Sequence, residues 1–222
     1  MYEYILEKID QGHELYIIEM IEILRKQNLF NHFRLHLVDK LMTSKTNHSY
    51  NLVKTILNDE FLKTIFQKEK LDKVFISKNI RVIKLLHKNK LDRKLISTFN
   101  SLYKQNYTEF IFGLMNNIQN IDYAQTLVDL GYVELSLCHL EKAVKIDNYL
   151  WVGFFLKNDT PFEYIRQKHL KKIIQSKKLR KNKEIYSKLH KIIPFYKKRC
   201  GLEILDQKIP ITLSNKFVFE FI

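Results

Sequence analysis

The chain carries one pattern twice, at residues 79–86 (NIRVIKLL) and at residues 148–155 (NYLWVGFF). Each stretch begins with Asn, which accepts the backbone angles of a tight turn, and continues with apolar residues three or four positions apart. This spacing gives a helix one apolar face, so each stretch predicts a short helix after a tight turn. Similar stretches begin at Asn51, Asn106 and Asn120, and most neighbouring starts are 27 or 28 residues apart. The spacing predicts an imperfect repeat of helix pairs with a period near 28 residues.

Apolar residues recur at helical spacing along nearly the whole chain, which predicts an all-α fold. Hydrophobic residues make up 45% of the 222 residues and aromatic residues 13%, so the chain can bury a core and is not expected to be disordered. It contains five Gly and three Pro, too few for the many turns of a β-sandwich or β-barrel. We expect an elongated array of short antiparallel helix pairs, with an irregular helical bundle as the alternative.

We expect residues 1–222 to form a single helical domain with three parts. Residues 1–48 hold the N-terminal helices, residues 49–158 hold the repeat-like helix pairs, and residues 159–222 hold basic helices and an apolar tail. The polar run at residues 43–49 predicts an early loop.

Other signals mark where helices begin and end. Gly131 follows an apolar helical segment and predicts a helix C-cap. Thr160, Pro161 and Glu163 are in the order expected for a capping residue, a first helical residue and a capping-box acid. The apolar tail at residues 209–222 is compatible with either a helix or a strand.

Residues 138–148 (CHLEKAVKIDN), continued to Leu156, resemble the two-helix half of an ankyrin repeat. Residues 79–86 resemble the outer helix of that repeat, and residues 127–131 (LVDLG) resemble the exit from it. The chain lacks the Thr-Pro-Leu-His opening of the family and the turn Gly, and its expected period is shorter than 33 residues. The resemblance is best over residues 79–158 and extends to Lys-, Asn- and Ile-rich chains that large DNA viruses encode. It implies a viral helical array that binds macromolecules.

Positive charge is concentrated in two blocks. The net charge is +14, of which residues 61–105 contribute +9 and residues 166–222 contribute +12, while residues 1–60 and 106–165 are acidic. A Lys-rich coding bias, as in an AT-rich genome, would raise Lys along the whole chain and would not leave two acidic segments. A solvated basic face and a surface for an anionic partner both fit the second block.

The densest cluster of cations surrounds the expected turn between two basic helices. We take it as the candidate surface for an anionic partner, and it comprises Lys171, Lys172, Lys177, Lys178, Arg180, Lys181 and Lys183. Because Arg is scarce in this cluster, contact with phosphates independent of base sequence is favoured over the reading of individual bases.

Three small constellations could suggest chemistry, and each has a simpler interpretation. His32 and His36 share one helix face, a spacing that metals use, but without further ligands we expect surface or partly buried histidines. Cys138 and His139 are adjacent on a helix and point about 100° apart, so we expect Cys138 to be a small core residue.

The third constellation, Asp206 with Lys208, fits half of a metal-dependent nuclease site and lacks the other half. We therefore expect no enzyme activity, metal or cofactor. Trp151, Phe154 and Phe155 could form an exposed binding spot, but their spacing favours the core.

The leading functional hypothesis is a non-catalytic helical-repeat protein that binds another protein. The alternative is a nucleic-acid-binding protein that uses the basic C-terminal surface, and a nuclease comes third. No stretch is apolar enough to span a membrane, and Glu3 and Glu7 interrupt the first apolar turn, so we expect an intracellular protein without a secretory signal. Two Cys cannot supply a disulfide framework, which agrees with that location.

Overall fold

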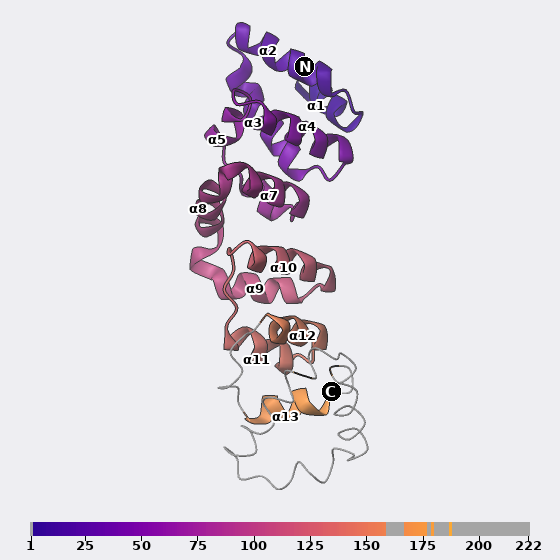
Figure 1. Ribbon diagram of the computed structural model, residues 1–222, viewed down its shortest axis with the longest axis vertical. Coiled ribbons are helices and arrows are strands. Elements are labelled where there is room, and N and C mark those ends of the chain that lie inside the picture. The colour runs from indigo at the N-terminus through magenta and orange to yellow at the C-terminus, as the bar shows by residue number, and fades with distance from the viewer. Residues whose placement is uncertain (1, 159–166, 177–178, 180–186, 188–222) are drawn as a thin grey trace, which may run out of the picture. The chain divides into compact units, whose positions relative to one another are not determined.

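The computed structural model describes residues 2–158, 167–176, 179 and 187, and this part of the chain is all-α. Figure 1 shows helices and no strand in it, which confirms the predicted fold class at that level. The predicted helix start at residues 160–163 and the tail at residues 209–222 lie outside the described residues. No helix in the described part is long and apolar enough to cross a bilayer.

The structure separates into two compact units, residues 1–134 and residues 135–222. The expectation of one domain over residues 1–222 stays a prediction. The α-helices of the first unit are α1 (Tyr2–Asp10), α2 (Glu14–Lys26), α3 (Phe30–Thr43), α4 (Asn47–Asn58), α5 (Thr64–Lys68), α6 (Asp72–Ile76), α7 (Ile80–Leu86), α8 (Asp92–Tyr103), α9 (Tyr107–Met115) and α10 (Ile121–Asp129). Short π- or 3-10-helical segments lie at η1 (His87–Leu91), η2 (Lys104–Asn106) and η3 (Ile118–Asn120). The second unit contains α11 (Leu137–Lys145), α12 (Tyr149–Lys157) and α13 (Gln167–Gln175).

A left-handed residue ends several helices and turns the chain into the next one. Lys78 and Asp147 have φ values of 54° and 55°, and Gly12 and Gly131 have φ values of 84° and 74°. After each of them, the next backbone N–H donates to the carbonyl five residues earlier, as in Asn79 to Val74 at 3.0 Å. This is the bonding of a Schellman motif, and the predicted C-cap at Gly131 is confirmed.

Residues 79–86 and 148–155 begin with the same turn. Asn79 and Asn148 have φ, ψ values of −82°, 78° and −86°, 78°, and each immediately precedes a helix. His13 adopts nearly the same angles, −83° and 60°, before α2. The backbone at these three positions is therefore equivalent even though only two of them are Asn.

The predicted period of 28 residues is wrong for the first unit. The second helices of the first three pairs, α2, α4 and α7, begin at Glu14, Asn47 and Ile80, so successive starts are 33 residues apart. The shorter period assumes that Asn51 precedes a helix, whereas Asn51 lies inside α4. The sequence alone does not distinguish an Asn on a helix surface from an Asn before a helix. Asn106 and Asn120 do precede helices, but those are the first and second helices of one pair.

Hydrogen bonds connect the turn after α1 to the turn before α4. Asp10 accepts hydrogen bonds from Lys40 Nζ, from Ser44 Oγ at 3.0 Å and from Thr46 Oγ1 at 3.3 Å. Partial burial opposes ionisation of Asp10, but these bonds prevail and lower its pKa. Thr46 also accepts from Ser49 N and caps α4, so the predicted loop at residues 43–49 is confined to the three residues between α3 and α4.

A second set of bonds connects the turn before α4 to the turn before α7. The buried Asn79 side chain donates to the carbonyl oxygens of Met42 at 3.2 Å and Ser44 at 2.8 Å. Ser77 Oγ also donates to Met42 O, at 3.0 Å. Arg81 Nη1 donates to Asn47 Oδ1 at 2.8 Å, beside the same turns.

A third set connects the α6–α7 turn to α10. Tyr123 donates its hydroxyl to Phe75 O at 3.0 Å, and Lys78 Nζ donates to Asn120 Oδ1 at 2.8 Å. Burial of the Tyr123 phenol raises its pKa far above the ordinary value, so the hydroxyl remains a donor. Side-chain hydrogen bonds therefore connect successive parts of the first unit from Asp10 to Tyr123.

Each unit has its own aromatic core. In the first unit, Phe99 lies against Phe75, Phe110 and Tyr132 with ring centroids 5.2–5.7 Å apart. In the second unit, the core comprises Trp151, Phe154 and Phe155, which are at most 5% exposed. Their predicted place in the core is confirmed. Burying such rings removes apolar area from water and stabilises each unit.

Candidate functional site

The described structure covers only two members of the predicted basic surface. Lys171 and Lys172 lie in α13, and Lys172 is exposed with its Nζ 3.2 Å from Asp147 Oδ1. The other members lie outside the described residues, and they are Lys177, Lys178, Arg180, Lys181 and Lys183. Their role as a surface for an anionic partner stays a prediction. An exposed pair such as that of Lys172 contributes little to stability and leaves the ammonium accessible.

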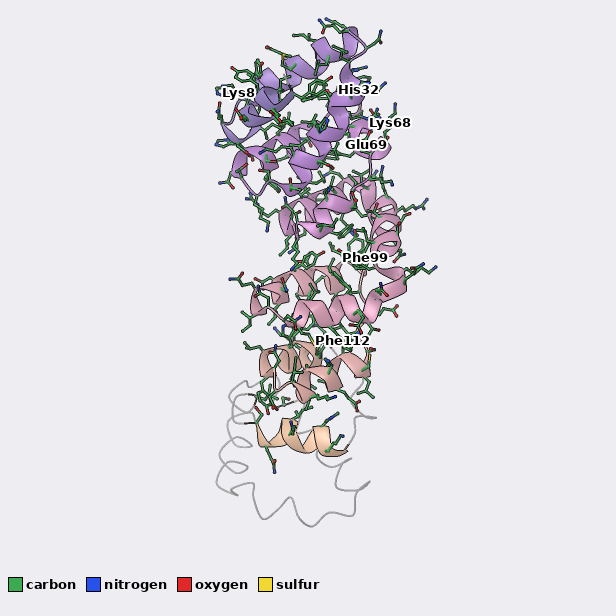
Figure 2. The ribbon with its side chains drawn as sticks, turned by 180° about the vertical axis from the view of Figure 1, so that it is seen from behind. Lys8, His32, Lys68, Glu69, Phe99 and Phe112 are labelled. Carbon is green, nitrogen blue, oxygen red and sulfur yellow. The ribbon has the colours of Figure 1, made fainter. Side chains whose placement is uncertain are left out.

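A groove with cationic side chains lies in the first unit between α2, α3 and α5, and its volume is about 270 Å³. Its lining residues are Ile21, Arg25, Asn28, Phe30, Asn31, Arg34, Phe61, Leu62, Thr64, Ile65 and Lys68. Figure 2 shows Lys68 and Glu69 beside each other at the end of α5, on the edge opposite Lys8. Because its walls come from three helices, no single stretch of sequence contains the groove.

One wall consists of an arginine stacked on a phenylalanine. The Arg25 guanidinium carbon lies 3.6 Å from the centroid of the Phe61 ring. Phe61 is 51% exposed, and its backbone N–H and that of Leu62 donate to Asp59 Oδ1 at 2.8 and 2.9 Å. Asp59 thus fixes the turn that presents the ring, and the ring orients the cation above it.

Arg34 also lines the groove and is held in one orientation. Its Nε pairs with the Glu69 carboxylate, and its Nη1 donates to Asn31 Oδ1 at 3.2 Å. Both side chains of the ion pair are largely buried, with 20% and 14% of their area exposed. A guanidinium held in this way retains N–H groups for a further carboxylate or phosphate, because Arg has five donors.

The groove combines an aliphatic floor with a positively charged rim. Ile21, Leu62 and Ile65 are buried below it. Lys68 is exposed and forms no ion pair within the described residues. Beyond it, Lys94 Nζ bonds to Gln67 O, and burial lowers the pKa of Lys94 while the nearby Glu69 opposes the change. The rim therefore continues as positive charge from α2 across α5 to α8.

Lys68 and Lys94 belong to the first of the two basic blocks found in the sequence, whereas Arg25 and Arg34 precede it. Residues 61–105 contain 12 Lys/Arg and 3 Asp/Glu, and one of those acids, Glu69, is bound to Arg34. None of the 12 cations forms an ion pair with a carboxylate in the described part of the chain. The sequence shows the charge of residues 61–105 but predicts a binding surface only in the C-terminal basic block. The groove was not predicted because it also requires Arg25 and Arg34 from earlier helices.

Comparison with known protein families, with curated proteins and with solved structures found no match for this chain.

The histidine prediction is confirmed, and the cysteine prediction is wrong. His32 and His36 are exposed, and the residues that the structure describes contain no group of three or more metal-ligand side chains. Cys138 is exposed. The buried face of α11 contains Leu140, Val144 and His139, and Cys138 is not part of it. The two neighbours point in different directions, as expected. Asp206 and Lys208 lie outside the described residues.

Proposed function

We propose that this protein is a non-catalytic helical array of ankyrin-like type that binds another protein. The observation that carries the proposal is the series of hydrogen bonds between successive parts of the first unit, through Asp10, Asn79 and Tyr123. These bonds join each helix pair of the first unit to the next in chain order. The 33-residue spacing of α2, α4 and α7 equals the period of ankyrin repeats.

This arrangement supports binding as the function. In a helical array each unit buries its apolar face against its neighbours, and the remaining surface is open and extended. A surface of this kind suits recognition of a macromolecule, and the groove between α2, α3 and α5 offers one concave part of it. A viral source and an intracellular location stay predictions that accompany the resemblance.

The test is affinity purification of the full chain from cells, with and without nuclease. We expect one or more proteins to remain bound after nuclease treatment and to be competed by untagged full chain. The matched control is the same chain unfolded and immobilised, which presents equal charge without the folded surface. Loss of every protein partner after nuclease treatment would contradict the proposal.

A second candidate function is sequence-independent binding of nucleic acid. It would use the basic C-terminal surface, and the cations of residues 61–105, none of them paired with a carboxylate in the described structure, favour it as a second source of phosphate contacts. Each phosphate contact contributes about 0.9 to the slope of log K against log salt on duplex DNA. Replacing Lys177, Lys178, Arg180 and Lys181 by Ala should therefore lower the slope by up to about four if the C-terminal surface binds phosphates. An unchanged slope would eliminate that surface.

A further inference from the structure

We infer that the groove between α2, α3 and α5 binds an acidic peptide segment of a protein partner, in which an apolar side chain lies between two carboxylates. The inference rests on the proposed function and names the site and the chemistry of its ligand. It is carried by the exposed Phe61 ring and by the cations Arg25, Arg34 and Lys68, which line the same groove.

The floor determines that part of the ligand is apolar. Phe61, with 51% of its area open to solvent, provides the accessible apolar surface, and Ile21, Leu62 and Ile65 also line the groove but are at most 6% exposed. A volume of about 270 Å³ accommodates one or two side chains. An aliphatic or aromatic side chain inserted there would displace water from apolar surface on both sides.

The walls determine the charge of the rest of the ligand. Arg25 is oriented by its stacking on Phe61, Arg34 is oriented by Glu69 and Asn31, and Lys68 extends from the end of α5. Both arginines are already ordered, so binding a carboxylate costs little additional side-chain entropy. Three cations that share the groove with the Phe61 ring match a segment with acidic residues next to its apolar residue.

A protein segment fits these features better than a nucleic acid does. Arg25 covers one face of the Phe61 ring at 3.6 Å, which reduces the aromatic surface on which a base could stack. The floor is aliphatic, and phosphates gain nothing from aliphatic contact. A peptide that alternates acidic and apolar side chains satisfies both the floor and the rim.

The test selects random twelve-residue peptides displayed on phage against the immobilised full chain. Enriched sequences are then synthesised with a fluorophore, and their affinity is measured by fluorescence anisotropy. We expect enrichment of an apolar residue flanked by Asp or Glu. Affinity should fall steeply between low and high salt, because exposed charges are screened.

Two variants locate the peptide in the groove. Lys68→Glu reverses the charge of an exposed cation at the rim that forms no ion pair in the described part of the chain, and Phe61→Ala removes the exposed ring. Neither side chain is part of the buried core, so both variants should fold. Each change should weaken binding about tenfold or more. Lys54→Glu is the matched control, because it makes the same charge change on the exposed face of α4, and it should alter affinity less than twofold.

Each result decides the question. The inference would be overturned if the enriched peptides lacked acidic residues. It would also be overturned if acidic peptides bound the Lys68→Glu variant as tightly as the unchanged chain. Failure to enrich any peptide would also overturn it, as would groove-dependent binding of a labelled single-stranded oligonucleotide in place of peptide. If cellular protein partners are retained equally by Lys68→Glu, the groove assignment fails and the proposed function stands. If no protein partner survives nuclease treatment, the proposed function fails.

Discussion

Replacing Asn79 by Ala tests the hydrogen bonds between the turns before α4 and α7. The change removes two donors, to Met42 O at 3.2 Å and to Ser44 O at 2.8 Å, at a residue that is 4% exposed. Met42 O retains the Ser77 hydroxyl at 3.0 Å, so its carbonyl keeps a partner, whereas Ser44 O loses its side-chain donor. Two net hydrogen bonds of about 1 kcal/mol each predict a loss of about 2 kcal/mol in the free energy of unfolding.

The measurement is urea unfolding followed by far-UV circular dichroism. A loss of this size corresponds to a decrease of about 4–8 °C in Tm. Asn51→Ala is the matched control, because Asn51 is exposed within α4 and Ala favours a helix, so this variant should lie within about 0.5 kcal/mol of the unchanged chain. A double change with Ser77→Ala should cost more than the two single changes together, since Met42 O then loses both donors. An Asn79→Ala chain as stable as the Asn51→Ala chain would refute the reasoning.

Three further predictions concern other positions. Burial lowers the pKa of His139 from 6.5 to about 4, so its neutral form contributes stability above pH 6.5 that is lost as the pH falls toward 4. The variant His139→Gln preserves a side-chain acceptor for Ser136 N and should flatten the dependence of Tm on pH between pH 6.5 and 4. Lys90 is exposed with a φ of 64°, so Lys90→Gly should raise the free energy of unfolding in urea by about 0.5–1 kcal/mol, and a decrease would contradict the left-handed assignment. In a Cys200→Ser background, a thiol reagent should label the exposed Cys138, and the rates in the native protein and in urea should differ by no more than about tenfold. Full protection of Cys138 from the reagent in the native protein would show that it is buried.

The local features of the fold could be predicted from sequence better than its spacing. Asn79 and Asn148 mark equivalent turns because a short polar residue tolerates the required angles, and Gly131 marks a C-cap for a similar reason. His13 occupies the same kind of turn without that signature, and Lys78 and Asp147 adopt left-handed angles that Gly usually provides. Tertiary packing sets those angles, so no local pattern reveals them and the 33-residue spacing was missed.

The groove could not be predicted because its parts are distant in sequence. Arg25, Arg34 and Lys68 are separated by up to 43 residues and meet only when α2, α3 and α5 pack together. The available signal was the charge of residues 61–105, which shows that cations gather there but not where they converge. Cys138 was misplaced for a related reason, since the partners of α11 decide which neighbour on the helix is buried.

The order of contacts in the first unit also bears on how the chain folds. α1 contacts α2, α3 and α4, while α3 contacts α6 and α4 contacts α7, so each helix packs against elements that follow it closely in sequence. Short loops close at a small entropic cost, and proteins dominated by such contacts fold fast. During synthesis, α1 to α4 can pack together once residue 58 has left the ribosome, and each later helix pair can then add to a surface already formed.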